Sequence, residues 1–212
     1  MDPIGDAAAA AVRGELVVFP TDTVYGIATI PHDPAATARL FEAKRRPRGV
    51  TLPVLVASVE VARALARFDE RADRLAGSLW PGGLTLVLPR QEASRSWELG
   101  DDVATIGLRV PRHPMALSIL AAAGPLATTS ANRSGGTPAR TCDELQSTFG
   151  ELVSVYLCQD EPIVGTASAV VDLTQADARL LRGGREDADR ISQALGAESS
   201  LLDSRAGVTR IP

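Results

Sequence analysis

Four short blocks of the chain combine cationic, hydroxyl and amide side chains in patterns that suit a phosphorylated ligand. The run L-A-T-T-S-A-N-R-S-G-G, from Leu126 to Gly136, begins like a strand and breaks into small polar residues. Backbone amides in such a loop can surround phosphate oxygens. The other blocks are F-P-T-D-T-V-Y-G (Phe19 to Gly26), A-K-R-R-P (Ala43 to Pro47), and S-A-V-V-D-L-T followed by L-L-R-G-G. Together the four blocks predict an enzyme that handles a nucleotide.

The basic block concentrates Lys44, Arg45, Arg46 and Arg48 in a chain whose net charge is −4. Arginine offers a planar fork to phosphate and lysine a movable point charge, so we predict a clamp for a polyphosphate. A solvated helix end and an RNA-binding patch are the alternatives. The acidic balance disfavours nonspecific coating of nucleic acid. The chain has no G-x-x-x-x-G-K-[ST] sequence, which disfavours an ATPase or kinase of that class.

The loop from Pro20 to Gly26 holds two threonines, an aspartate and a tyrosine, although these residue types also favour simple turns. Arg109 lies inside an otherwise apolar strand, and arginine is almost never fully buried without a partner. We therefore expect Arg109 to face a cavity or an acid, and a ligand carboxylate would serve. His32 and His113 both neighbour prolines and are interpreted as turn residues, so a Ser-His pair has no support.

Composition is typical of one globular domain, with 212 residues, 45% of them hydrophobic and 23% charged. Because no apolar run approaches the roughly 18 residues of a membrane span and no secretion signal is evident, we expect no membrane partner and a cytoplasmic location. Cys142 and Cys158 cannot form a disulfide framework and lack metal-ligand spacing. We expect both to fill space in the core or on the surface.

Short runs rich in Val, Leu and Ile alternate with helical patterns, which indicates an α/β domain whose sheet is at least partly parallel. Asp33-Pro34 marks a helix start, because Asp caps free amides and Pro tolerates the first helical position. Residues 197–212 carry no strong pattern and are expected to form a loose tail. The expected strands are 15–19, 53–57, 84–88, 105–110, 126–129, 152–157, 169–173 and 179–181, and the further expected helices are 59–67, 70–79, 115–122, 141–149 and 186–195.

Six motifs follow one another along the chain: P-T-D-T-V-Y-G (20–26), K-x-R-P (44–47), W-P-G-x-L-T (80–85), R-x-P-x-H-P (109–114), T-S-A-N-x-S-G (129–135) and S-A-V-V-D-L (168–173) with Arg182. In these motifs and their order, the chain closely resembles the YrdC/TsaC family of L-threonylcarbamoyladenylate synthases in its short form. The resemblance implies an α/β fold with a YrdC-like twisted mixed β-sheet, flanked by helices, and a large concave ligand site. It implies a YrdC-like domain over residues 7–196 and a tail over 197–212.

The resemblance further implies that L-threonine, bicarbonate or CO2 and ATP are joined into threonylcarbamoyl-AMP, with release of pyrophosphate and with Mg2+ accompanying ATP. A downstream enzyme complex would then transfer the threonylcarbamoyl group to an adenosine of tRNA, and strong direct tRNA binding is not expected. Metal ligands are not assigned. The implied catalytic residues are Lys44 and Arg46, the implied ATP-binding residues are Lys44, Arg46, Thr105, Ser130, Asn132 and Arg182, and the implied threonine-binding residues are Thr23, Tyr25, Arg109, Thr128 and Ser168.

The chain departs from the family pattern at several positions, among them Val50-Thr51, Leu55, Ala167 and Ala169. Gly183-Gly184 stands where relatives carry Pro-Gly, which predicts a looser segment. Two other functions stay open. One is a carbamoyltransferase that forms carbamoyladenylate, although such proteins usually carry zinc-finger and acylphosphatase modules that this sequence lacks. The other is a noncatalytic module that binds double-stranded RNA, which the acidic balance and the absence of an aromatic stacking platform disfavour.

Overall fold

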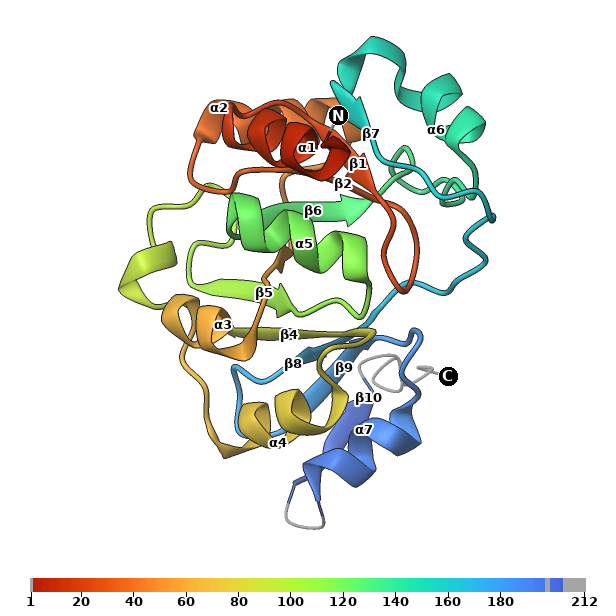
Figure 1. The fold of residues 1–212 in the computed structure, drawn as a ribbon. Helices are drawn as coiled ribbons and strands as arrows, with labels where there is room; N and C mark the ends of the chain where they lie inside the picture. The colour runs from red at the N-terminus through yellow and green to blue at the C-terminus, as the bar shows by residue number, and fades with distance from the viewer. Residues whose placement is uncertain (1, 197–198, 204–212) are drawn as a thin grey trace, which may run out of the picture.

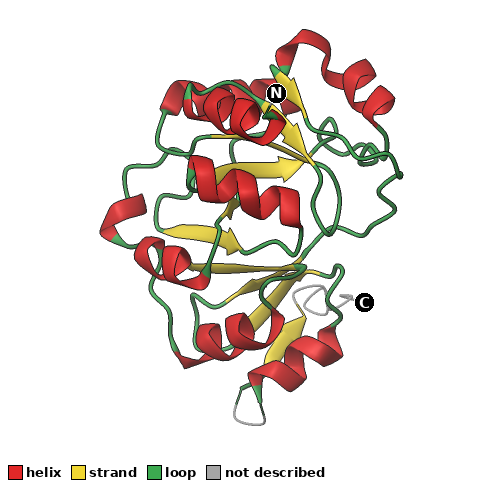
Figure 2. Cartoon of the chain, viewed as in Figure 1, coloured by secondary structure: helices red, strands yellow, loops and turns green. Residues whose placement is uncertain are grey.

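A computed structural model describes residues 2–196 and 199–203, in which ten strands form one twisted sheet with helices packed along it (Figures 1 and 2). The strand order is β10-β9-β8-β4-β5-β3-β6-β2-β1-β7, and both parallel and antiparallel pairs occur, so the predicted mixed α/β fold is confirmed. The strands are β1 (Val17–Phe19), β2 (Gly26–Thr29), β3 (Val54–Leu55), β4 (Leu84–Pro89), β5 (Thr105–Arg109), β6 (Leu126–Ser130), β7 (Val155–Tyr156), β8 (Ala169–Asp172), β9 (Ala178–Arg182) and β10 (Leu201–Asp203).

The helices begin at residues whose side chains satisfy free amide groups. Asp33 accepts a hydrogen bond from Ala35 N, which confirms the predicted start of the second helix. That helix ends at Lys44, where Arg45 takes a left-handed conformation (φ 51°) and turns the chain toward Arg46. The α-helices are α1 (Pro3–Val12), α2 (Pro34–Lys44), α3 (Val59–Leu65), α4 (Glu70–Leu79), α5 (Pro114–Ala123), α6 (Cys142–Phe149) and α7 (Ala188–Leu195).

One α-helix and two strands of the described residues were missed by the sequence analysis. Helix α1 has usable signals, since Asp2 caps it and Pro3 occupies its first position. Strand β2 is only four residues long and lies between β1 and β6, so its partners rather than its own pattern define it. Strand β10 pairs in parallel with β9, so the expectation of a loose tail is wrong for Leu201–Asp203. The rest of the predicted tail lies outside the described residues.

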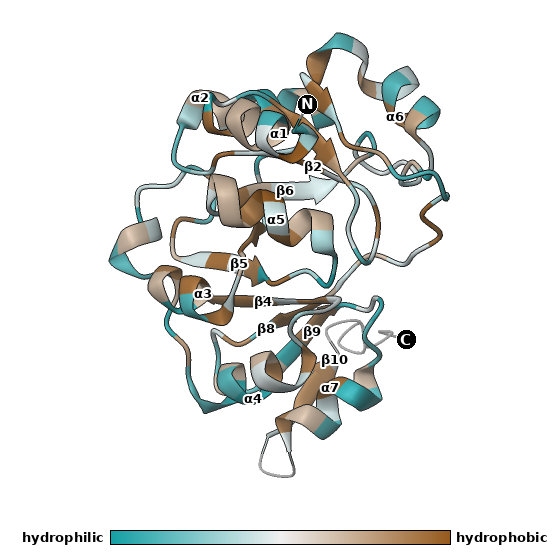
Figure 3. Cartoon of the chain, viewed as in Figure 1, coloured by the Kyte–Doolittle hydropathy of each residue, from teal (hydrophilic) through white to brown (hydrophobic). Residues whose placement is uncertain are grey.

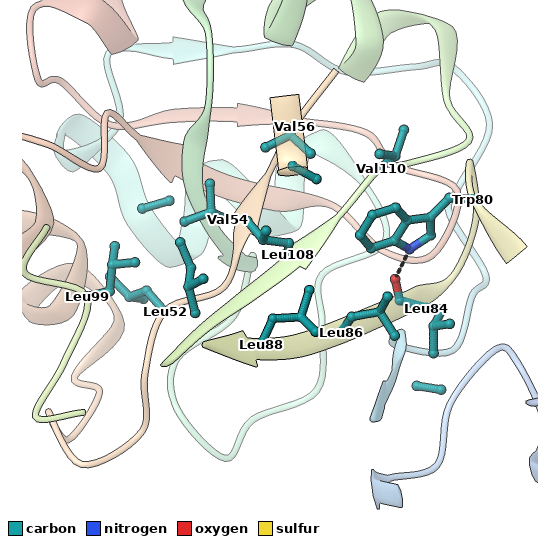
Figure 4. Close-up of a cluster of buried hydrophobic side chains, with 14 of the residues drawn as sticks. Leu52, Val54, Val56, Trp80, Leu84, Leu86, Leu88, Leu99, Leu108 and Val110 are labelled. Carbon is teal, nitrogen blue, oxygen red and sulfur yellow. Dashed lines mark hydrogen bonds between the residues drawn. The ribbon is translucent and has the colours of Figure 1, made fainter. Parts of the chain in front are cut away.

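Two apolar clusters hold the sheet and the helices together. Val17 and Phe19 of β1 pack into one cluster with α1 and α5, whereas Val18 between them packs into the other. This alternation follows from the two-residue period of a strand. Apolar residues are concentrated along β4, β5 and β8 (Figure 3). In the larger cluster, the Trp80 Nε1 donates a hydrogen bond to the Leu84 carbonyl (2.7 Å), so the buried indole is satisfied (Figure 4).

Cys142 and Cys158 form a disulfide, which corrects the expectation that both residues only fill space. Cys142 is the first residue of α6 and Cys158 follows β7, and the two lie 16 positions apart in the sequence. The fold brings their Cα atoms to 5.7 Å, a proximity that sequence spacing does not encode. None of the helices in the described part of the chain combines the length and apolarity that crossing a membrane requires.

Candidate active site

Loops and strand ends from across the sheet meet around a hollow of about 110 Å3, which we call the first hollow. Seven neighbouring strands, from β9 to β2 in the sheet order, contain or adjoin a residue that lines it. Seven strands in a flat sheet would be about 29 Å across, so they share a small hollow because the sheet is strongly twisted. The lining residues are Thr21, Thr23, Val24, Tyr25, Gly26, Arg46, Pro53, Leu55, Thr85, Arg109, Thr128, Thr129, Ser130, Ala167, Ser168 and Arg182.

All five residues predicted to bind threonine line the first hollow. The Thr23 hydroxyl accepts a hydrogen bond from Arg109 Nη1 (2.9 Å), and the Arg109 side chain is buried. Arg109 also forms an ion pair with Asp22 (2.5 Å). We expected Arg109 to face a cavity or an acid, and it does both. The part of the wall formed by these five residues therefore presents one guanidinium among hydroxyl groups. The five residues are Thr23, Tyr25, Arg109, Thr128 and Ser168.

The far wall of the first hollow is organised by Ser168, which directly precedes β8. The Ser168 and Thr85 hydroxyl oxygens lie 2.9 Å apart, and Arg182 Nη2 donates to the Ser168 carbonyl (2.8 Å) and more weakly to its hydroxyl (3.2 Å). Tyr25 is fully buried, and its hydroxyl accepts a hydrogen bond from Gln159 N (3.1 Å). These bonds hold the polar wall in place.

A second hollow of about 350 Å3 adjoins the first and shares Arg46, Pro53, Thr85 and Arg182 with it. The predicted ATP-binding residues Arg46 and Arg182 therefore stand where the two hollows join, and Thr105 lines the second. Its walls are more apolar than those of the first hollow, which suits a flat base beside a phosphate group. The other residues that line it are Gly49, Val50, Thr51, Leu52, Val87, Asp102, Gly107, Val170 and Leu181.

Positive charge collects at the junction although the chain as a whole is acidic. Burial lowers the pKa of Arg46, and the nearby charge of Arg182 lowers it further. Burial likewise lowers the pKa of Arg182. Arg46 donates to the carbonyls of Val50 (2.7 Å) and Thr51 (2.9 Å), so its position does not depend on an acidic partner. No Asp or Glu is among the described residues that line the first hollow, and the junction is therefore suited to an anion.

Most of the residues that depart from the family pattern lie at the two hollows. Val50 and Thr51 line the second hollow and supply the carbonyls that hold Arg46, a role that depends on their backbone only. Leu55 and Ala167 line the first hollow. Ala169 is fully buried at the start of β8.

Lys44 and Asn132 line neither hollow, so their placement differs from that of the other predicted ligands of ATP. Lys44 is only 1% exposed, and its Nζ donates to the carbonyls of Ser130 (2.5 Å) and Asn132 (2.6 Å) and to Asn132 Oδ1 (3.0 Å). Ser130 Oγ also donates to Asn132 Oδ1 (2.6 Å). The ammonium thus shapes the loop that carries Ser130. Direct contact of Lys44 and Asn132 with a nucleotide stays a prediction.

The ionisation of Lys44 is directly measurable, because it is the only lysine in the chain. Burial, assisted by the charges of Arg46 and Arg133, lowers the pKa of Lys44 from 10.5 to about 7. We expect an NMR titration of protein labelled at lysine to give one side-chain signal with a midpoint near this value. A midpoint above 10 would contradict the assignment, and denatured protein serves as the unshifted control.

The same shift has a consequence for stability. Between pH 7 and 10.5 the unfolded chain binds a proton at Lys44 that the folded protein releases, so the free energy of unfolding rises with pH by at most about 1.4 kcal/mol per pH unit. Below pH 7 both states hold the proton, and the full cost of the buried charge persists. Urea unfolding at pH 7, 8 and 9 should show the wild type gaining stability relative to Lys44→Met. If the free energy of unfolding changed with pH by the same amount in the wild type and in Lys44→Met, the shifted pKa of Lys44 would be contradicted.

The structure adds site residues that the sequence analysis did not select. Thr21, Thr85 and Thr129 line the first hollow, and Asp102 lines the second. Thr21, Thr85 and Thr129 lie inside the blocks that carried the resemblance, so selecting every polar residue of those blocks would have found them. Asp102 lies outside the blocks, and its carboxylate accepts from Ala104 N and Thr105 N (2.8 and 3.2 Å). Only the fold identifies it.

Comparison with known proteins decides the family. The Sua5/YciO/YrdC family model, described as "Telomere recombination", matches residues 9–184. The chain belongs to this family. A Mycobacterium tuberculosis protein, named provisionally as a threonylcarbamoyl-AMP synthase, is 40% identical to it over 200 residues, which cover 94% of this chain and 92% of that relative.

Solved structures of the Sua5/YciO/YrdC family share the architecture. Pyrococcus abyssi Sua5 complexed with L-threonine superimposes with a TM-score of 0.84 and 35% identity. The match covers 93% of this chain but 58% of the Sua5 chain, so this protein spans less than two thirds of that relative. Escherichia coli YciO has a TM-score of 0.82 at 24% identity and covers 89% of this chain and 92% of its own. At that identity the YciO likeness supports the fold alone.

Proposed function

We propose that this protein is an L-threonylcarbamoyladenylate synthase. It joins L-threonine, bicarbonate or CO2 and ATP, and it releases pyrophosphate. One observation carries the proposal: a small hollow lined by hydroxyls and Arg109 adjoins a larger hollow, and Arg46 and Arg182 line both. Relatives bearing the name threonylcarbamoyl-AMP synthase, and a Sua5 relative solved with L-threonine, support the same reaction.

The proposed chemistry uses position and charge rather than a covalent intermediate. The neutral amine of threonine attacks CO2 and loses a proton to solvent, which gives a carbamate. A carbamate oxygen then attacks the α-phosphorus of ATP, and the bond between that phosphorus and the departing pyrophosphate breaks. In the first hollow, Arg109 and Thr23 would hold the carboxylate of threonine, with Thr128 and Ser168 on its polar groups. The reacting atoms would then meet at the junction, where Arg46 and Arg182 stabilise the developing negative charge.

Lys44 would contribute by holding the backbone of the loop that contains Ser130 and Asn132, in addition to its own charge. Backbone groups fixed before the substrate arrives need no reorganisation during the reaction. We therefore propose Arg46 as the cation that contacts the phosphates and Lys44 as the residue that positions the loop.

Mg2+ is proposed to arrive with ATP. The described residues hold no group of three or more His, Cys, Asp or Glu side chains that could bind a metal ion by themselves. Mg2+ usually binds through substrate phosphates with one or two carboxylates and retained waters. Among the described residues that line the two hollows, Asp102 is the one carboxylate, and it would orient the metal–nucleotide complex.

The product is proposed to serve a tRNA-modifying transferase complex, which attaches the threonylcarbamoyl group to adenosine. The basic block gives little support to direct RNA binding, because Lys44 is buried and Arg46 faces the two hollows. Arg48 lies near Glu98 (3.4 Å) and over the Phe41 ring. We propose a cytoplasmic location, where ATP and tRNA are present. The Cys142–Cys158 bond would be unusual there, so its oxidation state in cells tests that proposal.

Purified protein supplied with ATP, L-threonine, bicarbonate and Mg2+ should release pyrophosphate and yield threonylcarbamoyl-AMP detectable by mass spectrometry. Omission of threonine should abolish both signals. Replacement of threonine by serine should weaken binding by about 1–3 kcal/mol, the usual contribution of one methyl group in a pocket. Absence of both products from purified protein that is shown to be folded would overturn the proposal.

Two further experiments with the purified protein, one with carbamoyl phosphate and one with double-stranded RNA, distinguish the competing functions. Carbamoyl phosphate in place of threonine and bicarbonate would yield carbamoyladenylate if the protein were a carbamoyltransferase. Double-stranded RNA binding that weakens with salt, but persists with saturating ATP and threonine, would favour the noncatalytic alternative. We expect neither result.

A further inference from the structure

The loop between β1 and β2 contains a buried carboxylate, Asp22, which no part of the proposed reaction uses. Its side chain is 7% exposed and lies against that of Arg109, whose Nη2 donates to Asp22 Oδ1 (2.5 Å). The same oxygen accepts from Arg112 N (2.9 Å), and Arg185 donates to the Asp22 carbonyl (2.8 Å). Asp22 is therefore itself held in place by two further contacts.

Arg109 is bound by the protein on three sides. Besides Asp22, its Nε donates to the Gly82 carbonyl (2.8 Å) and its Nη1 to Thr23 Oγ1 (2.9 Å). A guanidinium has five N–H donors, so two remain without a partner among the described residues. Arg109 lines the first hollow, whereas Asp22 lines a separate third hollow with Gly82, Arg112 and others. The carboxylate thus holds the guanidinium from behind the wall.

Charge makes this partner necessary. Burial lowers the pKa of Arg109, and Asp22 opposes that effect through its charge and its hydrogen bond. A buried guanidinium without a counter-ion would be expected to shift toward solvent or toward another acceptor. A carboxylate ligand needs two parallel N–H donors in a fixed plane. Loss of the rear partner would therefore disturb the donors that face the hollow.

We propose that Asp22 is a positioning residue that fixes the Arg109 guanidinium for recognition of the substrate's carboxylate. This inference rests on the proposed function, because it takes the amino-acid carboxylate as the ligand of Arg109. It assigns to Asp22 the selection of a free carboxylate over its neutral analogues. Asp22 contacts no substrate and does not line either substrate hollow.

The test compares binding of L-threonine and L-threoninamide by calorimetry. The amide lacks the carboxylate, so the ratio of the two dissociation constants reports the Arg109 contact. In the wild type we expect threonine to bind at least tenfold more tightly. In Asp22→Ala the ratio should fall toward one, in Asp22→Asn it should be intermediate, because Asn keeps the acceptor oxygen, and the KM for ATP should stay within twofold.

Glu186→Gln is the matched control, since Glu186 is equally buried, lines the third hollow and pairs at 2.5 Å with Arg190 rather than with Arg109. The ratio should be unchanged in this variant. If Asp22→Ala weakened the binding of both ligands equally, as a general loss of structure would, the ratio of dissociation constants would keep its wild-type value. That result would overturn the proposal. Tighter threonine binding by Asp22→Asn would also overturn it, because Asp22 would then compete with the substrate.

The adenylate assay on the wild type separates this inference from the proposed function. If the wild type forms product while the Asp22 variants keep the wild-type ratio, only the role of Asp22 is wrong. If the wild type binds threonine in preference to its amide but forms no product, the proposed reaction fails. A changed ratio in Asp22→Ala would still assign Asp22 its role at a carboxylate site.

Discussion

Replacement of Arg109 by methionine should eliminate measurable threonine binding and lower the free energy of unfolding by about 3–5 kcal/mol, the usual cost of leaving one partner of a buried ion pair uncompensated. Arg109 is 6% exposed, and its partner Asp22 is 7% exposed at the side chain, so water cannot readily replace the lost guanidinium. Chemical denaturation measures the change in the free energy of unfolding, and calorimetry with threonine measures the loss of binding.

The double variant Arg109→Met/Asp22→Asn separates the two effects. It removes the unpaired charge, while the amide oxygen of the introduced asparagine can still accept from Arg112 N, so much of the lost stability should return. Threonine binding should not return, because the guanidinium that holds the carboxylate is still missing. Recovery of binding in the double variant would show that Arg109 is structural and that the carboxylate binds elsewhere.

Replacement of Gly184 by alanine should lower the free energy of unfolding by about 2–3 kcal/mol, because the added methyl group overpacks the backbone beside it. A Cβ at this position would lie 2.2 Å from Ala169 N and 2.3 Å from the Ser168 carbonyl carbon. Backbone atoms cannot rotate away as a side chain can, so the Ser168 segment must shift. Because Ser168 lines the first hollow, adenylate formation should fall about 100-fold, as expected for a displacement near 1 Å.

Gly183→Ala is the control for this prediction, since nothing lies within 4 Å of a Cβ built there. It should leave activity unchanged and alter stability by no more than about 1 kcal/mol, with the reduced freedom of the unfolded chain favouring a small gain. Equal damage from both variants, measured by unfolding and product assays, would contradict the packing argument. The sequence predicted a looser segment at Gly183-Gly184, but only Gly183 has open space around it.

Much of the site could be anticipated because its residues fall in compact blocks, each recognisable without its neighbours in space. The isolated arginine in the apolar strand β5 required a cavity or an acid, and the structure provides both. What could not be anticipated is the identity of the acid, since Asp22 and Arg109 are separated by 87 positions. The burial of the Lys44 side chain could not be predicted either, because a basic residue at a helix end is equally compatible with a solvated surface.

The sequence alone determined the α/β class, the helix starts and the polar blocks, because these depend on local backbone preferences and on the period of apolar residues. The tertiary structure decided which blocks share a hollow, which cysteines bond, and where short strands such as β2 and β10 pair. Those outcomes depend on the twist of a ten-stranded sheet, which brings together residues that are distant in the sequence. Local patterns therefore supplied the chemical groups, and only long-range pairing set them around a common cavity.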